Sequence, residues 1–331
     1  MIETIPLGLQ TTYQDVLDRH RRRPVPDLEG SLLQTRDGYW VARQRMGDRV
    51  LERRIGPDTP ENRKRVEVIK RQQDDLQAWR QEVSALVAQL RAARLPVPAI
   101  GTGKLINALS RTGLFEKGGV LAGTHAFGLY ALELGVRLKD ALAMTEDVDV
   151  AATRSVSIIT DAQISLFNPI DAIGLQPVAS PMEKHPVRWS MQDGTVLDIL
   201  TPRQRGGEAI VHHKGLGVWA QALPYLEFSL TDPIEAVVLY REGILVRIPA
   251  PERYAIHKLI VASARTGTHR AKSQKDLQQA AALVEVLAEA RPYELQTAFN
   301  DAMSRGSKWQ QAIQASLKQR PDVAAIIEMR G

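Results

Sequence analysis

Two aspartates separated by a single residue, Asp147 and Asp149, are the clearest candidates for chemistry in this sequence. On a β-strand successive side chains point to opposite faces, so both carboxylates would share one face while Val148 and Val150 enter the core. Two carboxylates on one face repel each other unless a cation joins them. The pair therefore predicts a divalent metal site, and with it phosphoryl-transfer chemistry.

A glycine followed by a hydroxyl residue, Gly123-Thr124, precedes the pair at the junction of a predicted strand, residues 119–122, and a predicted helix, residues 125–134. Glycine lets the backbone approach a phosphate closely, and a hydroxyl and a helix N-terminus can both donate hydrogen bonds to it. The next residue is His125, whose imidazole could contact phosphate or cap the helix. This segment predicts a phosphate-binding turn.

A third carboxylate is expected from a later strand. Asp198 lies in a predicted strand over residues 196–200, and three carboxylates can hold two metal ions. Asp198 could also accept the proton of an attacking hydroxyl whose pKa one of these ions lowers. Asp193 and Asp171 compete for this role, whereas Glu146 alternates away from the pair and is expected to face solvent.

These features, in this order, resemble the DNA polymerase β-like nucleotidyltransferase superfamily, in which a glycine followed by Gly, Ser or Thr precedes a paired acidic motif and a third acid. Residues 120–150 and 249–259 look more closely like a bacterial nucleotidyltransferase-like group, itself similar to toxins of abortive-infection and toxin–antitoxin systems. The resemblance covers roughly residues 100–290. It implies an α+β fold whose polymerase β-like core is a mixed sheet with flanking helices.

The resemblance also implies roles for individual residues. Gly123 and Thr124 would hold the triphosphate of a bound NTP, such as ATP. His125 stands where the family has small or hydroxyl residues, and it joins the candidate nucleotide-binding residues. The catalytic carboxylates, which would also hold two Mg²⁺ ions, are Asp147, Asp149 and Asp198.

Two cations complete the candidate nucleotide site. Related toxins use a lysine on the helix after the catalytic sheet to bind phosphate, and the resemblance gives this role to Lys258. Arg265 is seven residues further on and so lies on nearly the same helical face. The alternative for Lys258 is a structural lysine whose stem lies along the core. Lys275 and Asp276 fall at a basic helix start, where Asp276 could instead be a helix-terminus partner.

Composition and missing motifs exclude several classes of protein. A chain of 331 residues with 44% hydrophobic and 24% charged residues is typical of a globular protein of two or three domains. No apolar run is long enough to span a bilayer and no signal-peptide pattern begins the chain, so a cytoplasmic protein is expected. The absence of cysteine excludes disulfides and thiolate chemistry. P-loop, serine hydrolase and zinc protease motifs are missing. Adjacent His212 and His213 would point to opposite faces of a strand, so they could not easily bind one metal ion together.

The net charge of +5, from 43 Lys and Arg against 38 Asp and Glu, is unevenly distributed. The first hundred residues contain Arg19, His20, Arg21, Arg22, Arg23, Arg43, Arg45, Arg49, Arg53, Arg54, Arg63, Lys64 and Arg65. Such density predicts a polyanionic partner, with tRNA favoured. The alternative is that these residues form solvated faces of a helix and a hairpin.

Three regions follow from the pattern along the chain. Residues 1–98 form a basic N-terminal region with a short helix, a β-meander and a long helix. In the middle strand of the meander, strict alternation would set Tyr39, Val41 and Arg43 on one face. The long helix, residues 60–94, carries an apolar stripe for packing or self-association. Residues 99–250 would be the nucleotidyltransferase core and residues 251–331 a helical region.

The sequence thus favours a magnesium-dependent nucleotidyltransferase that moves an NMP from an NTP to an acceptor hydroxyl, on tRNA or another nucleic acid. A toxin or defence role, with a cognate antitoxin as partner, follows by analogy only. One alternative is a non-catalytic protein that binds nucleic acid or another partner on the same fold. Another is an enzyme that modifies a protein or a small hydroxyl or amino compound.

Overall fold

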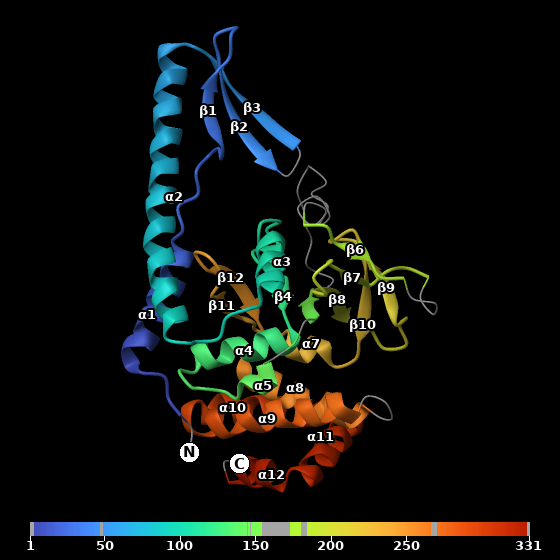
Figure 1. Cartoon of the computed structure of the whole chain (residues 1–331). Helices are drawn as coiled ribbons and strands as arrows, with labels where there is room; N and C mark the ends of the chain where they lie inside the picture. Colours follow the sequence, from blue (N-terminus) through green and yellow to red (C-terminus); the bar gives the residue numbers. More distant parts are fainter. Residues whose placement is uncertain are drawn as a thin grey trace.

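The computed structural model describes residues 3–46, 49–143, 145, 147–153, 173–179, 184–265 and 270–329. Its N-terminal part contains helix α1 (Leu7–Arg21), a three-stranded antiparallel sheet and the long helix α2 (Pro60–Ala92). The sheet strands are β1 (Ser31–Gln34), β2 (Tyr39–Met46) and β3 (Arg49–Pro57). The sheet and the first half of α2 form an arm that projects away from the rest of the chain (Figure 1).

Helix α2 connects the arm to the main body through two separate apolar contacts. Val66 and Ile69 pack under the small sheet, whereas the stripe from Leu76 to Leu90 packs into the main core. Between them, Gln73 donates hydrogen bonds to the carbonyls of Leu28 and Gly30, at 2.7 and 3.0 Å. The predicted helix is confirmed, and its apolar stripe is covered by the chain itself. Self-association through this helix would therefore use its other faces.

The pairing of β2 with β3 is interrupted by one β-bulge. Trp40 pairs with Gly56 and Val41 with Arg54, so the extra residue, Ile55, lies on β3, and Val41 and Ala42 of β2 are both buried. A bulge of this kind leaves its extra residue unpaired and increases the local twist. Arg43 remains exposed and pairs with Glu52 on β3, at 2.8 Å.

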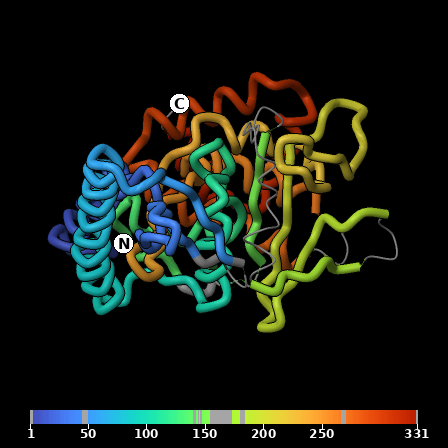
Figure 2. The backbone as a smooth tube through the Cα atoms, turned by 90° about the horizontal axis from the view of Figure 1, so that it is seen from above, coloured from blue at the N-terminus to red at the C-terminus, as the bar shows by residue number. Residues whose placement is uncertain are grey.

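The central sheet is mixed and carries the predicted acidic residues. Its strand order is β4-β5-β8-β10-β9, and β7 and β6 extend it from β8. Strands β5, β8 and β10 are parallel, whereas β4, β7 and β9 run antiparallel to their neighbours. The bounds are β4 (Val120–Leu121), β5 (Asp147–Ala151), β6 (Gln176–Pro177), β7 (Arg188–Ser190), β8 (Val196–Pro202), β9 (Ile210–His213) and β10 (Val218–Leu223). Figure 2 separates α2 from the strands of residues 173–223, which lie on the opposite side of the molecule.

Helices surround this sheet and form the C-terminal part. Those near the sheet are α3 (Ile100–Ser110), α4 (Gly123–Glu133), α5 (Asp140–Ala143) and α7 (Leu226–Ser229), with the hairpin β11 (Ile234–Val238) and β12 (Ile244–Ile248). The C-terminal ones are α8 (Pro251–Ala264), α9 (Arg270–Ala290), α10 (Pro292–Ser304), α11 (Ser307–Gln319) and α12 (Pro321–Glu328). The predicted α+β fold is confirmed, although β6, β10, α5, α7 and α12 were not expected.

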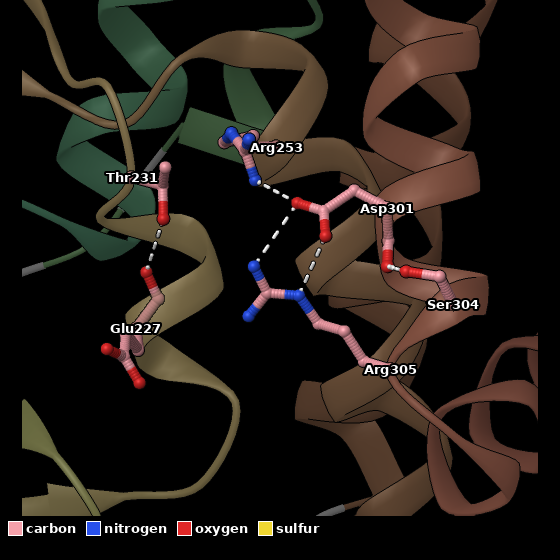
Figure 3. Close-up of polar contacts among 6 residues, drawn as sticks. All are labelled: Glu227, Thr231, Arg253, Asp301, Ser304 and Arg305. Carbon is pink, nitrogen blue, oxygen red and sulfur yellow. Dashed lines mark hydrogen bonds and ion pairs between the residues drawn. The ribbon is translucent and has the colours of Figure 1, made fainter.

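An ion-pair network fixes α8 within the C-terminal helices (Figure 3). Arg253 of α8 donates to Oδ2 of Asp301 on α10 at 2.8 Å, and Arg305 donates to both oxygens of the same carboxylate at 2.9 and 3.2 Å. Both guanidinium groups also lie over the ring of Phe228 on α7, at 5.0 and 5.2 Å from its centroid. The network holds α8 against α7 and α10. This matters for the site because α8 carries Lys258.

Candidate active site

Three charged residues form a row across neighbouring strands of the central sheet. Asp149 on β5 is the register partner of Asp198 on β8, and Asp198 is the register partner of Arg188 on β7. Side chains at directly paired positions of adjacent strands lie on the same face of a sheet. The three side chains therefore share one face, and the predicted proximity of Asp198 to Asp149 is confirmed.

Asp147 lies on the same face, two pairs further along the two strands. Its register partner is Val196, while Val148 and Val150 are completely buried on the opposite side of β5. This arrangement agrees with the expected alternation of the Asp147 to Val150 segment. The backbone N–H of Asp147 donates to Oγ1 of Thr145 at 3.2 Å, which fixes the start of the strand.

Gly123 lies directly beside this acidic pair. Its φ of +61° is in the left-handed region, and a Cβ atom added there would collide with Oδ2 of Asp149. The backbone N–H of Ala122 donates to the carbonyl of Asp149 at 2.8 Å, so the turn is joined to β5 immediately before α4. Glycine was expected here for access to a phosphate. The structure adds a second reason, the space that Asp149 needs.

The first turn of α4 presents N–H donors that have no hydrogen-bond partner among the described residues. Gly123, Thr124 and His125 are its first three residues, and no side-chain cap is seen within the described part of the chain. The N–H groups of a first helical turn have no partner inside the helix and favour anions. The pKa of His125 is lowered to about 4, mainly by burial, so the imidazole is neutral. Asp147 favours the protonated imidazole and Lys275 disfavours it, so the charges of both groups act on His125.

The electrostatics of Asp149 show that negative charge is concentrated at this point. Its pKa is raised to about 6, first by burial and next by the charge of Asp198, with a smaller effect of Asp147. Lys258 and Lys272 act in the opposite direction. A carboxylate whose ionisation is opposed by like charges gains from a nearby cation.

Arg188 already supplies a cation to one of these carboxylates. Its Nε donates to Oδ1 of Asp198 at 2.7 Å and its Nη2 donates to Oδ2 at 2.6 Å, and this pairing raises the pKa of the guanidinium. Arg188 had not been expected at the site. The hairpin around Asp193 could have indicated it. A three-residue loop between Met191 and Thr195 places Arg188 directly opposite Asp198 on the paired strand.

The acidic residues fit a divalent ion only in part. Asp147 and Asp149 share a face, and the charge of Asp147 opposes the ionisation of Asp149, as expected for a pair that would hold a cation. Both oxygens of Asp198 are occupied by Arg188. Within the described ranges, no three His, Asp or Glu side chains converge closely enough to bind one ion. Asp147 and Asp149 could thus bind a divalent ion directly, whereas Asp198 could bind one only after Arg188 has left its oxygens.

A buried hydrogen-bond chain fixes the Gly123 turn from behind. The Tyr254 hydroxyl lies 2.9 Å from the carbonyl oxygen of Gly123 and 3.0 Å from Oε1 of Gln279. Nε2 of Gln279 donates to the carbonyl of Leu142 at 2.7 Å, just before the acidic strand. The chain links α4, α8, α9 and α5, and its two side chains are almost completely buried. No sequence pattern had indicated these two residues.

The two predicted phosphate-binding cations share one buried carboxylate. Nζ of Lys258 lies 2.6 Å from Oδ1 of Asp276, and Nε of Arg265 lies 2.9 Å from Oδ2. The expectation that Lys258 and Arg265 face the same way is therefore confirmed, and Asp276 is the partner of both. The exposed fractions of the Lys258 and Asp276 side chains are 10% and 5%. In this arrangement, both cations are engaged by protein.

The remaining candidates lie outside the acidic row. Asp193 is exposed in the β7–β8 turn, where it accepts a hydrogen bond from the N–H of Thr195 at 3.0 Å. Asp171 and Glu146 fall outside the residues that the structure describes. His212 is exposed and packs edge-on against Trp219, whereas His213 is buried 3.0 Å from the carbonyl of Thr153. The two histidines face opposite sides, as expected.

No curated protein matches the chain. A solved structure, an antigenic nucleotidyltransferase-like protein from Paracoccidioides brasiliensis, is similar over 75% of this chain and 91% of its own, with 16% identity and a TM-score of 0.36. None of the helices within the described ranges is long and apolar enough to cross a membrane.

The family profile described as "Nucleotidyltransferase" matches residues 101–304, which is more than half of the chain. The match includes the Gly123 turn, the aspartates of β5 and β8 and the helices α8 and α9. The chain belongs to this nucleotidyltransferase family.

Proposed function

We propose that this chain is a magnesium-dependent nucleotidyltransferase that moves an NMP from an NTP to an acceptor hydroxyl, with release of pyrophosphate. The observation that carries the proposal is the row of Asp149 and Asp198 on paired strands, directly beside the Gly123 turn. Family membership agrees with NMP transfer in general. The magnesium requirement, the acceptor and the residue roles belong to the proposal.

The nucleotide would bind at the first turn of α4. The free N–H groups of this turn and the Thr124 hydroxyl donate to phosphate oxygens, and the helix dipole favours the same negative charge. His125 is neutral because burial lowers its pKa to about 4, so it can donate or accept a hydrogen bond without adding charge.

The carboxylates of β5 and β8 would hold the magnesium ions. Bound there, Mg²⁺ neutralises phosphate charge and lowers the pKa of the acceptor hydroxyl. Asp147 and Asp149 would hold the ions from one strand. Asp198 would complete the set and accept the hydroxyl proton. The raised pKa of Asp149, about 6, supports a cation at this point because like charge opposes its ionisation.

Positive charge for the leaving phosphates comes from the start of α9. Lys272 and Lys275 lie in its first turns, and Lys275 affects the pKa of His125 at the nucleotide turn. Lys258 and Arg265 add positive potential, although both contact Asp276. Lys258 also favours ionisation of Asp149. We therefore assign direct phosphate contact first to the exposed Lys272, with Lys275 adding positive potential, and to Lys258 and Arg265 only when they leave Asp276.

The acceptor would bind to the N-terminal arm, and we propose that it is tRNA or another nucleic acid. Many arginines of this region are paired with carboxylates, as Arg43 is with Glu52 and Arg63 with Asp58. Arg53 and Arg54 of β3 are exposed and have no ion pair within the described part of the chain. They are the side chains best placed to contact phosphates.

A labelling experiment tests the activity. The protein is incubated with each α-labelled NTP, Mg²⁺ and total RNA, and label in RNA and free pyrophosphate are measured. Wild-type protein is expected to label RNA, and Asp147→Asn and Asp149→Asn are expected to abolish labelling while retaining the fold. Label that persists in both variants contradicts the proposed site. Label in protein or in a small hydroxyl or amino compound would reassign the acceptor.

The arm is tested by replacing Arg53 and Arg54 together with glutamine. RNA affinity should fall, and the slope of its salt dependence should decrease by about 2, since two phosphate contacts are lost. The control is Lys308→Gln with Lys318→Gln on α11, which removes the same charge from exposed positions far along the chain. If the two double variants weaken RNA binding equally, the arm is not the specific binding site for the acceptor.

One observation favours a second candidate, a non-catalytic nucleic-acid- or partner-binding protein. Arg188 occupies both oxygens of Asp198, as expected for a site that no longer takes a metal. On this alternative the chain binds RNA with a steep salt dependence but labels no acceptor with any NTP. Binding that is unchanged by Asp149→Asn, together with no turnover, would establish it.

A toxin or defence role in the cytoplasm is part of the proposal by resemblance alone. Controlled expression in a bacterial host should then arrest growth, and Asp149→Asn should relieve the arrest. Growth that is unaffected by the wild-type chain at the same level of protein would argue against this role and its antitoxin partner.

A further inference from the structure

We propose that Arg188 is a built-in counter-cation which competes with a divalent metal ion for Asp198, so that metal loading requires this ion pair to open. This inference rests on the proposed function, because it assumes a metal site at Asp147 and Asp149. It adds a residue that the sequence did not indicate and a step that the proposed chemistry did not include.

The geometry of the pair is that of a complete carboxylate–guanidinium contact. Both oxygens of Asp198 accept a hydrogen bond from Arg188, at 2.7 and 2.6 Å, and the two residues are direct register partners. A fork of this kind matches the carboxylate plane and is among the strongest side-chain pairings. A metal ion that bridges Asp149 and Asp198 would have to share these oxygens with a cation or displace it.

The two partners differ in how firmly they are held. The exposed fraction of the Asp198 side chain is 12%, whereas that of Arg188 is 44%. Asp198 lies within β8, between β5 and β7, while Arg188 is the first residue of the three-residue strand β7. When the pair opens, the arginine is therefore the partner that can move into solvent, while the aspartate stays in the row.

The pair also reduces the repulsion between two aspartates that lie side by side. Asp198 and Asp149 are register partners, and like charges at this separation destabilise the fold. Arg188 neutralises Asp198 from β7, on the side of β8 opposite to Asp149. Removing the guanidinium takes away the closest counter-charge of Asp198, and a divalent ion then has more negative charge to compensate.

Mn²⁺ binding to the NTP-free protein, followed by electron paramagnetic resonance, tests this inference without reference to turnover. Arg188→Gln should bind Mn²⁺ about ten- to a hundredfold more tightly than wild type, because a repelling cation next to the ion is removed. In EDTA the variant should unfold at a lower temperature than wild type, and Mn²⁺ should raise its midpoint more. Arg188→Lys retains the charge without the fork and should give an intermediate affinity.

Arg63→Gln is a matched control. Arg63 donates to Asp58 through the same two nitrogens, at 2.7 and 2.6 Å, but on the N-terminal arm. Its replacement should leave Mn²⁺ affinity unchanged. In an Asp198→Asn background Arg188→Gln should have a much smaller effect on Mn²⁺ affinity, since the contested oxygens are then uncharged and only the repulsion between the guanidinium and the ion remains.

The outcomes separate this inference from the function on which it rests. Mn²⁺ binding that does not depend on Asp149 overturns the metal site of the proposed function, and this inference with it. Binding that is lost in Asp149→Asn but is unchanged or weaker in Arg188→Gln overturns this inference alone. In that case Arg188 positions Asp198 for the metal.

Discussion

Gly123 and Asp149 are in direct contact, and the contact leaves no room for a side chain at position 123. Oδ2 of Asp149 occupies the place of the missing Cβ, and the glycine φ of +61° is one that other residues rarely adopt. The nucleotide turn and the acidic strand therefore fit together as one unit. A substitution at Gly123 is therefore expected to displace the Asp149 carboxylate, and a substitution at Asp149 to alter the nucleotide turn.

Gly123→Ala should lower the rate of nucleotidyl transfer by about a hundredfold, because displacing Asp149 by even a fraction of its contact distance disturbs the reacting geometry. Gly206→Ala is the control. Gly206 has a similar φ of +71°, but nothing lies within 4 Å of an added Cβ. Both variants should lose about 1–2 kcal/mol of unfolding free energy to backbone strain. Equal activities of the two variants would show that the contact does not matter.

Tyr254→Phe should weaken NTP binding more than it slows chemistry. The hydroxyl lies 2.9 Å from the Gly123 carbonyl, so its loss frees the nucleotide turn while the carboxylates keep their strand positions. Unfolding free energy should fall by about 1–2 kcal/mol as buried acceptors lose a donor. The measurement is KM for the NTP against kcat.

Tyr13→Phe provides a comparison for Tyr254→Phe. The Tyr13 hydroxyl is buried and accepts a hydrogen bond from the N–H of Val237 at 3.1 Å, well away from the carboxylates in the fold. Tyr13→Phe should lower the unfolding free energy by a similar amount to Tyr254→Phe and leave KM for the NTP unchanged. A parallel rise of KM in both variants would mean that the effect of Tyr254 is one of general stability.

The buried pair of Lys258 and Asp276 should be costly to break from one side. Lys258→Met or Asp276→Leu alone is expected to lower the unfolding free energy by about 3–5 kcal/mol, because each leaves a charge without its closest partner. The double variant should lose less than the sum of the two. Denaturant unfolding of the four proteins measures this coupling. Additive losses would show that the 2.6 Å contact contributes little.

Stability should decline in acid because buried histidines must gain a proton when they are exposed on unfolding. Burial lowers the pKa of His20 from its ordinary 6.5 to about 4. A depressed pKa of this kind contributes stability that is present above pH 6.5 and is lost as the pH falls towards about 4. Between pH 7 and pH 5 the loss from His20 is about 2 kcal/mol.

His20→Gln should therefore show about 2 kcal/mol less acid loss over this range than wild type in urea unfolding. The glutamine can still donate to the carbonyl of Glu242, which lies 3.1 Å from Nε2 of His20. His212→Gln, at an exposed position, should retain the wild-type pH dependence. An unchanged pH dependence in His20→Gln would mean that other groups cause the acid loss.

Several features of the site could be predicted because they depend on local periodicity. Alternation places Asp147 and Asp149 on one face of β5, and Val148 and Val150 on the other, as the structure has them. The glycine at a strand-to-helix junction was recognised from its position alone, and Asp198 from the strand pattern around it. Each of these inferences spans only a few residues of chain.

The basic N-terminal run shows where such reasoning stops. As a sequence it is a continuous cluster of positive charge, but in the fold Arg19 pairs with Asp15 and Glu82, and Arg21 with Asp18 and Glu235. His20, in the middle of the run, is buried against Trp79. A helix turns consecutive residues in different directions, and what each one meets is decided by packing.

The sequence by itself determined the α+β class, the acidic pair on one strand face and the glycine turn before α4, because these follow from strand and helix periodicity and from the backbone freedom of glycine. Only the tertiary structure decided the partners of the charged groups, Arg188 for Asp198 and Asp276 for Lys258. The reason is physical: charge acts over the distance between side chains, and strand register and helix packing set that distance. The chemistry proposed for Asp147 and Asp149 thus depends on which cation the fold brings to Asp198.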